Sequence, residues 1–79
     1  MNDKAIWLSL ILYNNRMVKA ATHPDEESAI EYLYEYMALN MIYAAVDDGD
    51  SMGQTLHKAS RRTNYTFGWL KVEGLNAEF

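Results

Sequence analysis

Two strand-like segments on either side of Asn14 and Asn15 limit the fold of this chain more than any other feature. Residues 4–13 are rich in Ile, Leu, Trp and Tyr, which favours a strand buried on much of both faces. Asparagine tolerates the left-handed backbone of tight hairpin turns, so Asn14 and Asn15 predict a turn. The more polar residues 16–22 then predict a second, antiparallel strand. Because Met17 with Val18, and Ala20 with Ala21, break the alternation, its register is left open.

A long helix is predicted after this hairpin. Pro24 suits a first helical turn, and the acids at 25–27 complement the positive end of the helix dipole. Helix-favouring residues continue to at least Asn40, and to Val46 in the longer interpretation. Gly49 is a typical C-terminal stop, although the acids around it oppose the dipole and favour an earlier end.

A short helix and a last strand are predicted in the remaining sequence. Ser51 is suited to cap a helix over residues 52–62, and the rival interpretation makes 55–60 a strand. Residues 65–73 predict a strand in which Gly68 marks a bulge or a close contact. The predicted order is therefore β-β-α-(α)-β.

The predicted fold is α+β, a three-stranded antiparallel sheet with one long helix packed on one face and a second, short helix. With 79 residues the chain forms one small domain, 1–79, in which 74–79 are expected to be a loose tail. The absence of cysteine excludes disulfides and thiolate metal sites. His23 and His57 alone predict no metal site, and no cofactor is expected.

Charge is unevenly distributed along the chain. Eight of the eleven acids lie between residues 20 and 57, where there is no Lys or Arg, and the net charge is −4. Such segregation favours association with a charged partner. No apolar run is long enough to cross a membrane, and the signals of a leader peptide are missing. We therefore expect a cytoplasmic protein, or one of the host cytoplasm if the source is viral.

The long helix carries two apolar stripes that are predicted to lie roughly opposite each other. The expected core stripe is Ile30, Leu33, Tyr34, Met37, Met41 and Ala44. The second stripe is Tyr32, Tyr36, Leu39, Tyr43 and Val46. A helix on one face of a sheet buries only one stripe, so the second is predicted to meet the short helix, a second copy of the chain, another protein or water. Tyrosine is enriched at such interfaces.

No residue pattern predicts catalysis. Thr55 and Ser60 lie near His57, but no orienting group or oxyanion motif accompanies them. Asp47, Asp48 and Asp50 carry oxygen ligands suited to Mg²⁺ or Ca²⁺, yet the calcium-loop pattern is incomplete and predicts a solvated turn. The chain is therefore expected not to be an enzyme.

The favoured function is a non-enzymatic protein-binding module. Small size, acidity and lack of cysteine are typical of phage or mobile-element inhibitors, such as anti-CRISPR proteins, that block bacterial nucleic-acid-handling complexes. A homodimer is the other expected association. The predicted partner-binding residues are Tyr32, Tyr36, Tyr43, Glu31, Glu35, Asp47, Asp48 and Asp50.

The alternative function is a small domain that binds single-stranded nucleic acid by charge and base stacking. The predicted residues are Lys58, Arg61, Arg62, Phe67 and Trp69. The net acidity of the chain disfavours this alternative.

Overall fold

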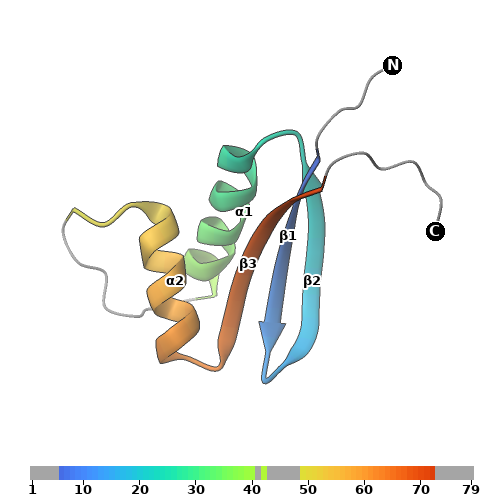
Figure 1. Ribbon diagram of the computed structural model, residues 1–79. Helices are drawn as coiled ribbons and strands as arrows, with labels where there is room; N and C mark the ends of the chain where they lie inside the picture. Colours follow the sequence, from blue (N-terminus) through green and yellow to red (C-terminus); the bar gives the residue numbers. More distant parts are fainter. Residues whose placement is uncertain (1–5, 41, 43–48, 73–79) are drawn as a thin grey trace, which may run out of the picture.

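The computed structural model describes residues 6–40, 42 and 49–72 (Figure 1). The elements are β1 (Ile6–Tyr13), β2 (Arg16–His23), α1 (Glu26–Leu39), α2 (Met52–Arg62) and β3 (Tyr65–Val72). The sheet order is β2-β1-β3, and both neighbours of β1 run antiparallel to it. The predicted α+β fold is confirmed. The expected tail at 74–79 lies outside the described residues.

The hairpin between β1 and β2 turns at the two asparagines. Asn14 and Asn15 have φ values of 54° and 66°, the left-handed conformation that the sequence predicts. Ile11 pairs with Lys19 but Leu12 pairs with Met17, so one extra residue of β2 forms a bulge. This bulge explains why β2 does not alternate cleanly in sequence.

Helix α1 begins at Glu26, two residues after Pro24, which the sequence places in the first turn. Asp25 is the N-cap, and its carboxylate accepts a hydrogen bond from the Ser28 N–H at 2.8 Å. Pro24 therefore precedes the cap, which corrects the predicted placement. The helix ends at Leu39, and the side-chain amide of the C-cap, Asn40, donates to the Tyr36 carbonyl at 2.9 Å.

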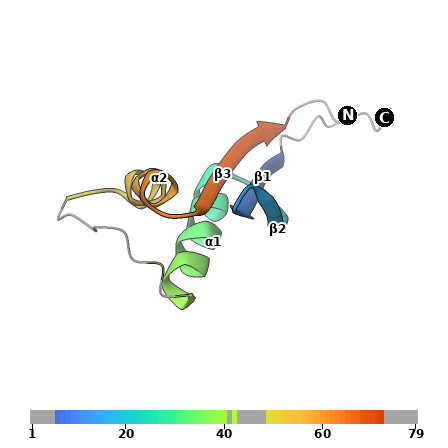
Figure 2. The ribbon, with the colours of Figure 1, turned by 90° about the horizontal axis from the view of Figure 1, so that it is seen from below.

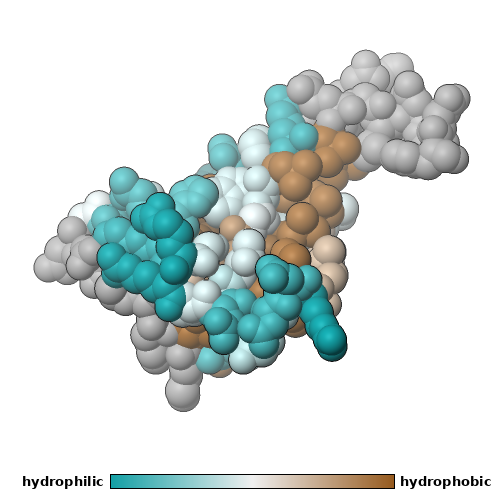
Figure 3. All heavy atoms as spheres, turned by 60° about the horizontal axis from the view of Figure 1, so that its bottom comes forward, coloured by the Kyte–Doolittle hydropathy of each residue, from teal (hydrophilic) through white to brown (hydrophobic). Residues whose placement is uncertain are grey.

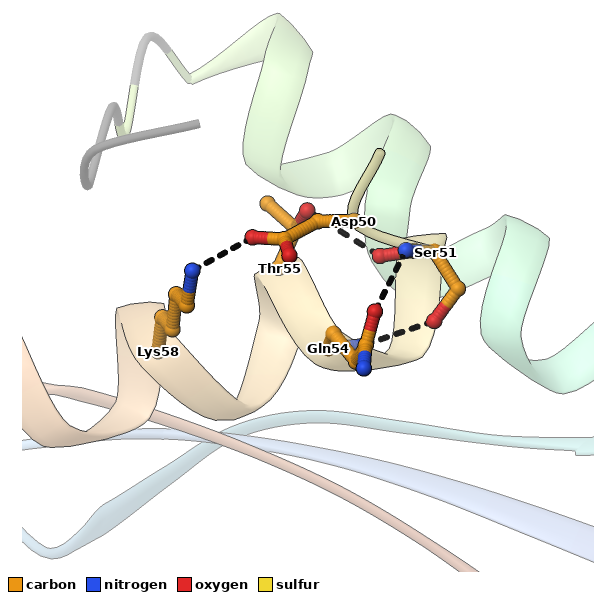
Figure 4. Close-up of polar contacts among 5 residues, drawn as sticks. All are labelled: Asp50, Ser51, Gln54, Thr55 and Lys58. Atoms are coloured by element: carbon orange, nitrogen blue, oxygen red, sulfur yellow. Dashed lines mark hydrogen bonds and ion pairs between the residues drawn. The ribbon is translucent and has the colours of Figure 1, made fainter. Parts of the chain in front are cut away.

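Helix α2 confirms the helical interpretation of residues 52–62. Ser51 and Gln54 form a capping box in which each side chain satisfies the other's backbone N–H, with distances of 2.9 and 3.2 Å (Figure 4). Thr55 Oγ1 donates to the Ser51 carbonyl at 3.1 Å. These local bonds fix the start of the helix and exclude a strand here.

The helices cover one face of the sheet. Helix α1 lies across the three strands, and α2 packs against α1 and β3 (Figure 2). The buried core is Ile11, Leu33, Met37, Ile42, Leu56, Ala59 and Phe67. Ile11 and Phe67 are paired neighbours, so their shared face is the one under the helices.

The other face of the sheet has no described element over it. Leu8, Leu10 and Leu12 alternate with the buried residues of β1 and are only half-buried. The predicted burial of β1 on much of both faces is therefore complete at Ser9 and Ile11, under the helices, and partial at these three leucines. Gly68 also differs from its prediction, because β3 pairs with β1 without a bulge and a Cβ at Gly68 would meet nothing within 4 Å.

Candidate functional site

The tyrosines of α1 lie beside its buried row, not opposite it. The buried row is Ala29, Leu33 and Met37. Tyr36 follows Ala29 by seven residues, nearly two full turns, so the two share a side of the helix. This geometry corrects the predicted arrangement of two opposite stripes.

Two of the predicted tyrosines contact the sheet through their rings. The Tyr32 ring centroid lies 5.1 Å from that of His23. The Tyr36 ring lies 6.5 Å from the rings of both Tyr65 and Phe67. Both tyrosines are half-buried, so part of each remains open to a partner. The third predicted tyrosine, Tyr43, lies outside the described residues.

A shallow hollow of about 590 Å³ runs over the solvent side of α1. Its lining residues are His23, Ser28, Glu31, Tyr32, Tyr34 and Glu35. The structure therefore brings together three residues that the sequence predicts for partner binding: Glu31, Tyr32 and Glu35. We call this surface the acidic hollow.

The acidic hollow has the chemistry of a site for a cationic side chain. Glu31 and Glu35 are exposed and lie one helical turn apart. Tyr32 and Tyr34 place phenol rings in the same surface. Carboxylates attract a guanidinium or ammonium group, and an aromatic face adds a cation–π contribution. None of the described residues that line the hollow is a Lys or Arg, so these do not neutralise its charge.

The N-terminal end of α1 adds to the negative field. The Ser28 backbone N–H, and then its side chain, donate hydrogen bonds to Asp25 and hold the pKa of that carboxyl below its usual value. Asp25 is therefore ionised at neutral pH.

A comparison with protein-family models, curated proteins and solved structures finds no match.

A serine and a histidine that sequence reasoning missed lie together on the sheet. Ser9 Oγ is 2.9 Å from His23 Nε2 and 3.4 Å from the Ala21 carbonyl oxygen. Only the register of the hairpin brings them together, because they are 14 residues apart in sequence. Ser9 is fully buried, at 0% exposure, so this hydroxyl has no access to a substrate. The contact satisfies a buried polar group.

The hydroxyls near His57 are also used structurally. Thr55 is 1% exposed and donates to the Ser51 carbonyl, and Ser60 donates to the Leu56 carbonyl at 3.0 Å. No described contact places the hydroxyl of Thr55 or Ser60 beside His57 as a nucleophile.

The predicted acidic turn is described only in part. Asp50 forms an ion pair with Lys58, with Oδ2 and Nζ 2.5 Å apart (Figure 4). Asp47 and Asp48 lie outside the described residues. Among residues 6–40, 42 and 49–72, no group of three His, Asp or Glu side chains is arranged to hold a metal ion.

The residues of the nucleic-acid alternative do not form one accessible surface. Arg61 and Arg62 are exposed at the end of α2. Phe67 is 3% exposed and would have to leave the core to stack on a base. The Trp69 indole N–H donates to Glu26 at 3.2 Å, and its ring lies 5.0 Å from that of His57.

One groove near these residues has mixed charge. It has a volume of about 290 Å³ and is lined by Asp50, Gln54, His57, Lys58 and Arg61. The Asp50 carboxylate lowers the attraction of this groove for phosphate.

Neither described helix is long and apolar enough to cross a membrane.

Proposed function

We propose that this chain is a non-enzymatic protein-binding module that recognises a basic surface of its partner through the acidic hollow. The observation that supports this function is the position of Glu31 and Glu35 beside the rings of Tyr32 and Tyr34 in one concave surface. An Arg or Lys side chain of the partner fits this combination of charge and aromatic faces.

The charge distribution supports a partner that itself handles nucleic acid. Asp25, Glu26 and Glu27 lie on the same helix end as the hollow and extend its negative field. Grooves that bind phosphate backbones present Lys and Arg, and such a groove also attracts an acidic helix face. We propose that the module acts as an inhibitor of such a groove, of the kind that phages and mobile elements encode. Acids then speed the encounter, and the partly buried rings hold the complex.

The test is an NMR titration of the ¹⁵N-labelled protein with a hexa-arginine peptide. We expect the largest amide shifts at Glu31, Tyr32 and Glu35. Glu31→Gln or Glu35→Gln should weaken binding about two- to fivefold, the range typical of an exposed charge pair. Glu27→Gln removes the same charge from the same helix outside the hollow, so it is the matched control and should have a smaller effect.

A second titration with an unstructured oligothymidine separates this function from the nucleic-acid alternative. The proposal expects no shifts at Arg61 and Arg62 at physiological salt. Shifts at these residues that disappear in an Arg61→Glu, Arg62→Glu variant would favour the alternative. Peptide shifts that spread evenly over all acids of α1 would contradict the hollow as the site.

A further inference from the structure

One wall of the acidic hollow is a histidine of the sheet. Among the described residues that line the hollow, His23 is the last residue of β2 and the others belong to α1. His23 pairs with Trp7, which lies on the same face of β1 as Ile11 because side chains alternate along a strand. His23 is therefore on the face under the helices, and a positive charge on it is a charge inside the hollow.

The imidazole ring of His23 is held between a strand and a helix. Its Nε2 atom lies 2.9 Å from the Oγ atom of Ser9, which is fully buried in β1. Its ring centroid lies 5.1 Å from that of Tyr32 on α1, with the two planes inclined at 52°. His23 is half-buried and lines the hollow, so the ring has a fixed place in the wall and is still reached by solvent.

The hydrogen bonds of Ser9 determine which nitrogen of His23 can gain a proton. The Ser9 hydroxyl donates to the Ala21 carbonyl at 3.4 Å, so its oxygen accepts the bond from the His23 Nε2–H. Nδ1 is then the nitrogen that gains a proton when the ring becomes charged. Because the bond to Ser9 is the same in both charge states, protonation changes the charge of the wall without releasing the ring.

Helix α1 faces His23 with acidic groups. Glu31 and Glu35 line the same hollow, where Tyr32 adds its phenol group. The pKa of Asp25, the N-cap, is lowered by the backbone and side-chain hydrogen bonds of Ser28 and also by the positive charge of His23. The charge of His23 therefore acts on the acids at this end of α1.

The strands place no charged residue directly beside His23 within the described residues. Its neighbours on β1, Trp7 and Ser9, are uncharged. Two basic residues share this face of the sheet, Lys19 on β2 and Lys71 on β3. Lys19 is about 13 Å away along the strand, and Lys71 is about 10 Å away across two strand spacings. His23 is therefore the one residue of the described hollow wall that can bring a positive charge into it.

We propose that His23 makes the acidic hollow a pH-dependent site, which binds a cationic side chain more tightly when His23 is neutral than when it is protonated. This inference rests on the proposed function of the hollow. An imidazole ordinarily changes its charge between about pH 5 and 8. An imidazolium in the wall repels a bound guanidinium and offsets part of the charge of Glu31 and Glu35. Affinity is therefore highest above this range and falls as the pH falls through it.

The test is the titration with the hexa-arginine peptide, followed by NMR at pH 7.5 and at pH 5.5. Guanidinium groups stay charged at both values, and ordinary glutamates titrate lower, near about pH 4.3. We expect the Kd to be about two- to fivefold weaker at pH 5.5, the range typical of one exposed charge pair. In His23→Gln the two Kd values should be equal, because glutamine can donate to Ser9 but does not titrate.

His57→Gln is the matched control. The chain has two histidines, and His57 is exposed on α2, where its ring lies 5.0 Å from that of Trp69. Figure 3 shows hydrophilic side chains gathered on the side of α2. Because His57 does not line the hollow, His57→Gln should keep the full difference between the two Kd values.

The ring signals of His23 in the NMR spectrum give a second readout that needs no substitution at this position. Binding of the peptide should lower the pH at which His23 gains its proton and leave that of His57 unchanged, because coupling between two sites is reciprocal. In the free protein, Glu31→Gln with Glu35→Gln should also lower it, because carboxylates favour the charged ring.

The outcomes separate this inference from the proposed function. Equal Kd values for the wild type at the two pH values, or loss of the difference in His57→Gln, would overturn the role of His23 and leave the proposed function standing. An unchanged His23 titration in the glutamine double variant would do the same. A peptide that binds at neither pH would overturn the proposed function and this inference together.

Discussion

The Ser60 hydroxyl is hydrogen-bonded to the Phe67 backbone on the edge of β3 that does not pair with β1. Ser60 Oγ accepts a hydrogen bond from the Phe67 N–H at 2.9 Å and donates to the Leu56 carbonyl at 3.0 Å. The Ser60 side chain of α2 thereby satisfies the Phe67 backbone N–H, which does not pair with β1. The Phe67 side chain itself lies in the core and is 3% exposed. The helix acts as a cover for an edge strand that would otherwise offer pairing groups to other chains.

Ser60→Ala should lower the free energy of unfolding by about 1–2 kcal/mol, because the Phe67 N–H loses its acceptor in a partly buried place. Urea denaturation measures this change. Arg61→Ala, exposed in the same turn, is the control and should change stability by less than about 0.5 kcal/mol. A Ser60→Ala protein as stable as the wild type would show that the edge bond contributes nothing.

Ser51→Ala should destabilise the protein by about 1 kcal/mol, because it removes the N-cap acceptor of α2. Gln54→Ala removes the reciprocal bond to the Ser51 N–H. A double-mutant cycle in thermal unfolding should show that the two losses are not additive, since the capping box is one unit. Strict additivity would contradict a coupled box.

The Asp25 cap should make stability depend on acid pH. The pKa of Asp25 is lowered in the fold by the Ser28 N–H bond, so its contribution is complete above the pKa of the unfolded chain. This contribution is lost as the pH falls through the lower folded pKa. Asp25→Asn keeps a capping oxygen without the titration.

Denaturation of both proteins from pH 7 down to about pH 2 measures this dependence. We expect the stability advantage of the wild type over Asp25→Asn to shrink as the pH falls below about 4, near the ordinary aspartate pKa. If the difference in stability between the wild type and Asp25→Asn stayed constant over this range, the lowered pKa of Asp25 would contribute nothing to stability.

Ser9 should not react with a fluorophosphonate probe, although it lies 2.9 Å from His23 Nε2. The probe labels activated serines that a substrate can reach, whereas Ser9 is fully buried. Mass spectrometry of the folded protein and of Ser9→Ala should show the same absence of label. Stoichiometric labelling of Ser9 in the wild type would show that Ser9 is an accessible, activated nucleophile and would contradict the proposed non-enzymatic function.

Much of the fold follows from local signals in the sequence. Asn14 and Asn15 predict the turn, and Ser51 predicts the start of α2, because each acts through its own backbone or a neighbour within one turn. The β2 bulge shows in sequence as broken alternation, but its place requires the partner strand. Pro24 was predicted in the first turn but lies just before the N-cap, because Asp25 caps the helix better than it continues it.

The candidate site follows from the sequence only in part. Glu31, Tyr32 and Glu35 are predicted from helical spacing, and the structure brings them into one hollow. Tyr34 was assigned to the core stripe, and the hollow adds it together with His23, which reaches α1 from the end of β2. No spacing rule links residues on different elements, so these neighbours come from packing alone.

The sequence by itself determined the order of elements, their turns and caps, and the segregation of acids, because these depend on residues close together along the chain. Tertiary structure decided which faces are covered. Two helices pack on one side of a three-stranded sheet, so the Ile11 face becomes the core and the Leu10 face stays open. In sequence the face of Leu8, Leu10 and Leu12 is the more apolar one, since the Ile11 face also carries Ser9, so only the position of the helices makes the Ile11 face the core.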